Sequence, residues 1–126
     1  MKEEQKQMIE SYINAYNDFD LDGMLKDLHH EIVFENITQG KVDLKTEGID
    51  AFKKQAESAK QYFKKRKQLI ESWKFTDQIV TVEIDYKGVL AVDLLNGMKS
   101  GDTIQLKGKS EFVFKNNKII GIQDKS

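Results

Sequence analysis

Apolar residues near the N-terminus recur at steps of three and four, which is typical of one face of a helix. Six positions share this spacing: Met8, Ile9, Tyr12, Ile13, Tyr16 and Phe19. The pattern predicts a helix over residues 3–18. Asp20 suits the N-cap of a second, short helix, and a third is predicted over residues 49–63, where Phe52, Ala56, Ala59 and Phe63 share one face.

Alternation of apolar and polar residues predicts strands in most of the remaining chain. Such alternation covers residues 32–37, 69–75, 80–86, 104–114 and 119–123, and a short strand is expected near 42–44. Gly88 is expected to mark a bulge in a long strand. The predicted order, α-α-β-(β)-α-β-β-β-β, indicates an α+β fold. With no linker or repeat, we expect a single domain over residues 1–126.

Composition and charge exclude several classes of function. Twenty basic residues oppose 21 acidic ones, so the chain lacks the basic excess that is typical of nucleic-acid-binding domains. It has no apolar run near the roughly 20 residues of a membrane span and no apolar N-terminal segment of a signal peptide. Cysteine is absent, which excludes disulfides and thiol nucleophiles. We therefore expect a cytoplasmic protein with no nucleic-acid or membrane partner.

The order of elements, with the segment Asp20-Leu21-Asp22-Gly23 after the first helix, resembles the NTF2-like superfamily. The tail GKSEFVFKNNKIIGIQDKS is similar to that of its SnoaL-like branch, in which a Phe-x-Phe strand leads through a tight turn into the last strand. The resemblance covers nearly the whole chain. It implies an NTF2-like cone, in which a curved mixed or antiparallel sheet wraps around three helices from the N-terminal half and encloses a pocket.

Ketosteroid isomerase is the relative in this superfamily whose mechanism is best understood. It uses an aspartate base, with a tyrosine and a protonated aspartic acid as oxyanion donors. The resemblance matches the tyrosine to Tyr12, the base to Asn36 and the protonated acid to Ser110. An amide cannot abstract a proton, so efficient isomerisation of a steroid-like enone is not expected. A bulge in the first strand would instead turn Glu35 toward the pocket.

Glu71 is a further candidate for acid or base chemistry. In a strand it would share one face with Leu69, Trp73 and Phe75, and a carboxylate on an apolar face is partly desolvated. The alternative is that this face points outward near a dimer contact, or that the register of the strand is shifted. Trp73 is either a pocket wall for a flat ligand or a residue of the core or of an interface.

Other polar clusters are predicted to be structural. His29 and His30 lie near the end of the second predicted helix, where neighbouring side chains point about 100° apart and do not readily share one metal ion. Arg66, the only arginine, lies in the lysine-rich run 60–67, which is predicted to be a solvated helix end. No glycine-rich phosphate loop is present. We therefore expect neither a metal nor a nucleotide cofactor.

The leading functional hypothesis is that a small, largely hydrophobic molecule binds in the pocket. Tyr12, Asn36 and Ser110 would orient this ligand through hydrogen bonds. The predicted walls are Tyr16, Phe34, Trp73, Leu106 and Phe112. Apolar walls with a few convergent polar groups are typical of such sites.

Two alternatives remain at this point. One is an enzyme of the isomerase, cyclase or dehydratase type that acts on a hydrophobic carbonyl compound, with Glu71 as the base. The other is a non-catalytic interaction module with a filled core. A homodimer formed through the sheet is expected under all three hypotheses, because the run from Val89 to Leu95 is apolar on both sides.

Overall fold

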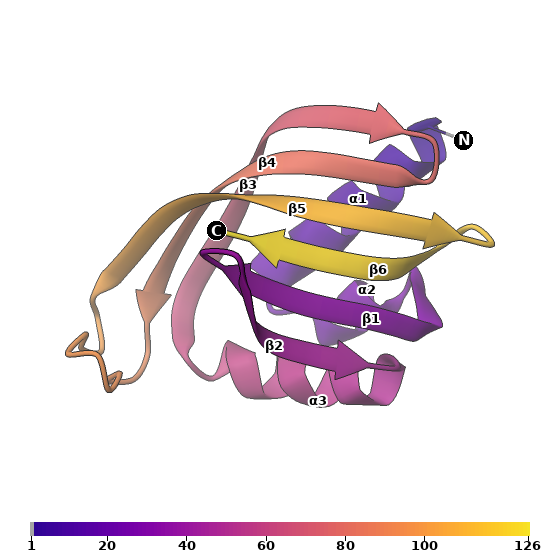
Figure 1. Cartoon of the computed structure of the whole chain (residues 1–126). Helices are drawn as coiled ribbons and strands as arrows, with labels where there is room; N and C mark the ends of the chain where they lie inside the picture. The colour runs from indigo at the N-terminus through magenta and orange to yellow at the C-terminus, as the bar shows by residue number, and fades with distance from the viewer. Residues whose placement is uncertain (1) are drawn as a thin grey trace.

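The computed structural model describes residues 2–126, which form a curved six-stranded sheet with helices against it (Figure 1). The elements in chain order are α1 (Lys2–Asn17), α2 (Leu21–Leu25), β1 (Leu28–Thr38), β2 (Lys41–Glu47), α3 (Ile49–Lys60), β3 (Phe63–Thr76), β4 (Ile79–Leu90), β5 (Thr103–Lys115) and β6 (Lys118–Lys125). The strand order is β2-β1-β6-β5-β4-β3. Neighbouring strands are antiparallel except β1 and β6, which run parallel. The predicted α+β class is confirmed.

The helices cover the inner face of the sheet. α1 buries Ile9, Tyr12 and Ile13 on its apolar side and packs against β3, while α3 packs against β1 and β2. The Asp20 carboxylate accepts a hydrogen bond of 3.0 Å from the Gly23 N–H and so caps α2. Within residues 2–126, no helix has the length and apolar character needed to cross a membrane.

Two predicted helix ends were wrong. α3 ends at Lys60, where the Gln61 and Tyr62 N–H groups bond to carbonyls three residues back, and Phe63 begins β3 instead of ending the helix. α2 ends at Leu25, so His29 and His30 lie on β1 and not at a helix end. Pairing with β6 sets this second boundary, since β1 begins where residue 28 pairs with residue 119.

The apolar run from Val89 to Leu95 is a strand only as far as Leu90. The chain then forms a loop over residues 91–102, in which the Leu94 N–H bonds to the Met98 carbonyl and Leu95 is fully exposed. Gly88 keeps a regular register with both neighbouring strands, so the bulge predicted there was wrong. The homodimer inferred from this run stays a prediction.

A bulge in β3 separates residues that the sequence placed on one face. Ile70 pairs with residue 84 and Ser72 with residue 83, which leaves Glu71 as the extra residue. Leu69 and Glu71 are therefore exposed on the outer face, whereas Trp73 packs against the core on the inner side. The alternative of a shifted register is confirmed.

Candidate functional site

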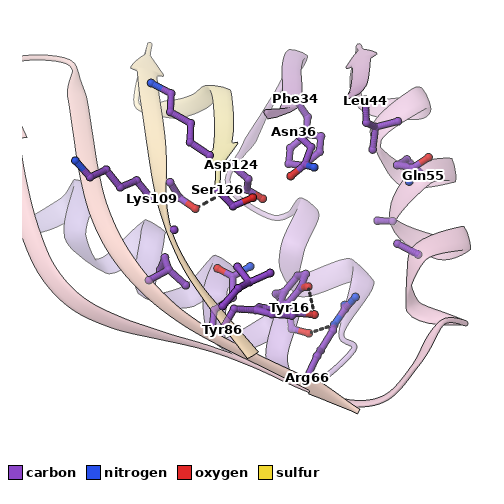
Figure 2. A pocket seen from close by; sticks show the side chains of 18 of the residues that line it. Tyr16, Phe34, Asn36, Leu44, Gln55, Arg66, Tyr86, Lys109, Asp124 and Ser126 are labelled. Carbon is purple, nitrogen blue, oxygen red and sulfur yellow. Dashed lines mark hydrogen bonds between the residues drawn. The ribbon is translucent and has the colours of Figure 1, made fainter. Parts of the chain in front are cut away.

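A cavity of about 530 Å³ lies between the inner face of the sheet and the helices α1 and α3 (Figure 2). Its walls are mainly apolar and include Phe34, Leu44, Phe52, Ile84 and Leu106. The volume falls within the roughly 300–1,000 Å³ that is usual for small-molecule sites. These apolar walls are interrupted by two groups of polar residues. One group lies on β1, β6 and β5, and the other lies around β3.

The first polar group is a row across three neighbouring strands. Asp124 on β6 pairs in register with Asn36 on β1 and with Ser110 on β5, and all three line the cavity. The Ser110 hydroxyl donates a hydrogen bond of 2.7 Å to the Asp124 carboxylate. We call Asn36, Asp124 and Ser110 the carboxyl row.

Asp124 is the titratable centre of the carboxyl row. Burial raises the pKa of its carboxyl to about 6, and the hydrogen bond from Ser110 offsets part of this rise. The residue keeps some exposure because it faces the cavity, while protein surrounds its remaining sides. Near neutral pH this carboxyl is therefore able both to take up and to release a proton.

The amide of Asn36 has an orientation fixed by Asp43. Its Nδ2 atom donates a hydrogen bond of 2.9 Å to one Asp43 oxygen, and the Thr38 hydroxyl donates one of 2.8 Å to the other. These bonds lower the pKa of Asp43, so its carboxylate only accepts hydrogen bonds. Asp43 is the extra residue of a bulge between β1 and β2, which turns it toward the strand that carries Asn36. The amide oxygen of Asn36 therefore remains available as an acceptor.

The second polar group joins α1 to β3 and β4. The Tyr16 hydroxyl donates to the Tyr86 hydroxyl at 3.2 Å, and Arg66 Nε donates to the Tyr16 carbonyl at 2.8 Å. We call Tyr16, Arg66 and Tyr86 the donor cluster. Figure 2 shows it across the cavity from Asp124 and Asn36.

The phenols around the cavity are held in their neutral form. Burial is the main reason that the pKa values of Tyr12, Tyr16 and Tyr86 are raised, and the negative charge of Asp124 adds to each rise. Tyr12 lies almost fully buried against Phe112 and borders the cavity. These residues therefore present hydroxyl groups and not phenolates to a bound molecule.

Comparison with protein families gives one match that spans most of the sequence. The model described as SnoaL-like domain matches residues 9–122. The chain belongs to the SnoaL-like domain family. A search of curated protein sequences gave no match to this chain.

Solved structures share the fold of this SnoaL-like domain at low sequence identity. A proposed polyketide cyclase from Xanthomonas campestris pv. campestris has a TM-score of 0.84 and 19% identity, covering 98% of this chain and 90% of that one. TsrD from Streptomyces laurentii has a TM-score of 0.80 and 14% identity over 98% and 88%. TerC, co-crystallised with polyporic acid, has a TM-score of 0.76 and 15% identity over 96% and 89%. The NTF2-like cone is thereby confirmed.

The structure of the SnoaL-like domain places most of the predicted site residues around one cavity. Six of them line it: Tyr12, Tyr16, Phe34, Asn36, Leu106 and Ser110. Glu35 points to the opposite face of β1, where its carboxylate accepts a hydrogen bond of 2.7 Å from Gln123. The bulge near Asn36 adds its extra residue to β2 and not to β1. Asn36, not Glu35, therefore lies on the cavity face.

Three predicted site residues lie outside the cavity lining. Glu71 is on the outer face and forms an ion pair of 3.1 Å with Lys107, as a consequence of the bulge in β3. Trp73 stacks on Phe75 beside α1. Phe112 is almost fully buried in the core. The hypothesis of Glu71 as a pocket base is corrected accordingly.

The sequence analysis missed Asp124, Tyr86 and Arg66. Asp124 follows the predicted end of the last strand by one residue, and its alternation with Ile122 is the signal that was available. Arg66 was predicted to be solvated, but it is 6% exposed because it lies on β3 and faces inward. Lys65 and Lys67 on either side of it are exposed, which is the alternation of a strand.

His29, His30 and Glu31 form a small cluster at the start of β1. Their possible ligand atoms lie within 4.8 Å of one another, and the two imidazole rings stack with centroids 4.4 Å apart. The Nδ1 atom of His29 already accepts a hydrogen bond of 3.0 Å from the Glu31 N–H. The expectation that these residues bind no metal stays a prediction, and its argument from helical geometry does not apply.

Proposed function

We propose that the cavity binds a small, largely apolar carbonyl compound and that Asp124 exchanges a proton with it. The observation that carries this proposal is a carboxyl with a pKa of about 6 on the wall of an apolar cavity. A general base works best when its pKa lies near the working pH. The likeness to a proposed polyketide cyclase and to a protein co-crystallised with polyporic acid supports the same class of ligand.

The proposed step is removal of a proton from a carbon next to a carbonyl group. The Asp124 carboxylate takes the proton, the electrons of the C–H bond form a carbon–carbon double bond, and the carbonyl oxygen takes the negative charge. Return of the proton to a different carbon gives an isomer. Attack of the enolate carbon on a second carbonyl of the same molecule closes a ring, with the proton returned to the new alkoxide.

Other residues of the cavity would hold the carbonyl compound during this step. Ser110 keeps its hydrogen on Asp124, so it positions the base. The hydroxyl of Tyr12 has no hydrogen-bond partner within residues 2–126 and borders the cavity, so it is available to a ligand oxygen. A neutral phenol that donates to a developing oxyanion stabilises the charge.

The test is deuterium exchange at the carbon next to the carbonyl of 2-tetralone, followed by NMR. The wild type is expected to accelerate the exchange, and Asp124→Asn to lose about 10²–10⁴-fold of the rate. Glu71→Gln is the matched control, because it removes a carboxylate on the outer face and should leave the rate unchanged. Equal rates for wild type and Asp124→Asn would contradict the proton-transfer role, and absence of tetralone binding would contradict the whole proposal.

A further inference from the structure

Arg66 is a buried cation without a carboxylate partner. It is 6% exposed, and within residues 2–126 no acidic oxygen lies inside the 4.0 Å of an ion pair with it. A guanidinium stays charged in proteins, and a buried charge that is left unpaired is costly. The fold therefore leaves a positive charge at the donor cluster that an anion would neutralise.

Contacts with Tyr16 and Phe19 hold the guanidinium in place without neutralising it. Its central carbon lies 3.7 Å from the ring centroid of Tyr16 and 4.4 Å from that of Phe19. Its Nε atom is bonded to the Tyr16 carbonyl, whereas its two terminal nitrogens have no hydrogen-bond partner within residues 2–126. Arg66 borders the cavity, so these two nitrogens form a ready fork for a planar carboxylate.

Gly88 allows the Phe63 ring and the Tyr86 hydroxyl to pack closely beside Arg66. It is the cross-strand partner of Arg66 on β4. A Cβ atom at this position would lie 2.9 Å from the ring of Phe63 and 3.1 Å from the Tyr86 hydroxyl. The Tyr86 hydroxyl accepts the hydrogen bond from Tyr16, which leaves its own hydrogen free to add a donor beside Arg66.

The surface next to Arg66 is basic. A second hollow is lined by Arg66 and by outward-facing residues of β3, β4 and β5; it carries Lys64, Lys65, Lys67 and Lys87, with Asp85 as its one acidic residue. A hollow lined by one sign of charge raises the local concentration of the opposite ion. This surface therefore favours the approach of anions to the donor cluster.

We propose that Arg66 binds a carboxylate group of the ligand, so that the molecule taken up by the cavity is an apolar carboxylic acid. This inference rests on the proposed function, since it names the ligand class of the same cavity. The acid group lies at the donor cluster and the apolar body extends along the cavity toward the carboxyl row. A carboxylate at this end is kept apart from the negative charge of Asp124, across the cavity in Figure 2.

The experiment compares two probes of nearly equal shape, 2-naphthylacetate and 2-naphthylacetamide, by titration calorimetry at pH 8. The wild type is expected to bind the carboxylate about 10- to 100-fold more tightly than the neutral amide. Arg66→Met should abolish this preference while the affinity for the amide stays within about threefold. Arg66→Lys should keep part of the preference, because lysine retains the charge but not the planar fork.

Lys74→Met is the matched control, since it removes a charge from an exposed position of the same strand that lines neither the cavity nor the basic hollow. It should preserve the preference for the carboxylate. Wild-type protein that binds both probes equally would overturn the inference but leave the proposed function standing. A preference that survives in Arg66→Met, with thermal unfolding showing a folded variant, would also overturn it. Failure of the wild type to bind either probe would contradict both.

Discussion

The two polar groups on the cavity wall are built in different ways. The carboxyl row lies on three adjacent strands whose regular pairing brings Asn36, Asp124 and Ser110 side by side. The donor cluster depends on the end of α1 and on an edge strand with a bulge between Phe63 and Lys65. The first group follows from backbone register, whereas the second depends on close packing around an irregular segment. Substitutions that remove a polar group should therefore test the carboxyl row. Substitutions that add atoms to tightly packed positions should test the donor cluster.

The largest effect is expected in the pH dependence of proton exchange with 2-tetralone. Because the pKa of Asp124 is about 6 and the carboxylate is the active form, the rate should rise about tenfold per pH unit below 6 and level off above it. Ser110→Ala removes a hydrogen bond that lowers this pKa, so the midpoint should move to higher pH. Ser72→Ala, on the exposed side of β3, should leave the midpoint in place. A rate that does not change between pH 4 and pH 8 would contradict the assignment.

Loss of space at the donor cluster should have the next largest effect. Gly88→Ala forces a Cβ atom against Phe63 and Tyr86, and overpacking of this kind lowers the free energy of unfolding by about 1–3 kcal/mol. The affinity for 2-naphthylacetate should fall as well. Urea unfolding measures the first effect and calorimetry the second. Glu83→Ala, at an exposed position of the same strand, serves as the control, and an equal response of the two variants would contradict a role for close packing at Gly88.

Asp124 is expected to lower the stability of the fold above pH 6. Its pKa is higher in the folded protein than in the unfolded chain, so the folded state binds more protons between pH 4 and pH 6, and stability falls as the pH rises through this range. Asp124→Asn should therefore raise the free energy of unfolding at pH 8 by about 1–2 kcal/mol. This is less than the free energy that corresponds to the whole pKa shift, because the carboxyl faces the cavity. At pH 4 the gain should vanish. Urea titrations at both pH values check the sign.

A smaller effect is expected from the phenol nearest the core. Tyr12→Phe keeps the packing against Phe112 and removes one hydroxyl, so the free energy of unfolding should change by less than about 1 kcal/mol. The affinity for 2-tetralone should fall by about three- to tenfold, because one hydrogen bond to the ketone is lost. A change in stability without a change in affinity would show that Tyr12 is a core residue only.

The predicted homodimer, formed through the outer face of the sheet, should not alter ligand binding at the carboxyl row or the donor cluster. Light scattering at micromolar concentration is expected to give twice the chain mass of 14.6 kDa. Leu69 is 51% exposed on the outer face of the sheet, and Leu69→Lys should shift the distribution toward the monomer without changing the affinity for the neutral probe 2-naphthylacetamide. A monomeric wild type would exclude the homodimer.

The sequence predicted the fold and part of the carboxyl row because both depend on regular periodicity. Tyr12 falls on the helical repeat of α1, and Asn36 and Ser110 fall on alternating strands, so their inward direction could be read directly. Asp124 was missed because the predicted strand ended one residue too early. The register between β1 and β6 that makes it the neighbour of Asn36 joins distant parts of the chain and leaves no local signal.

The donor cluster and Glu71 were mispredicted for a different reason. A lysine-rich segment has no apolar alternation, so the inward direction of Arg66 depends on knowing where α3 ends and β3 begins. Glu71 was assigned to the wrong face because a bulge adds one residue and reverses every later position of the strand. Local periodicity predicts direction only between such irregularities.

The position of β6 in the sheet also bears on how the chain acquires its structure. β6 is the last strand in sequence but lies between β1 and β5, so before it docks the sheet consists of two separate halves. The parallel pairing of β1 with β6 joins residues about 90 positions apart, and closure of so long a loop slows folding. During synthesis on the ribosome, the edges of β1 and β5 would stay unpaired until β6 had been synthesised. The base of the proposed reaction would then be assembled in the same event that completes the sheet, so an unfinished chain would carry no active site.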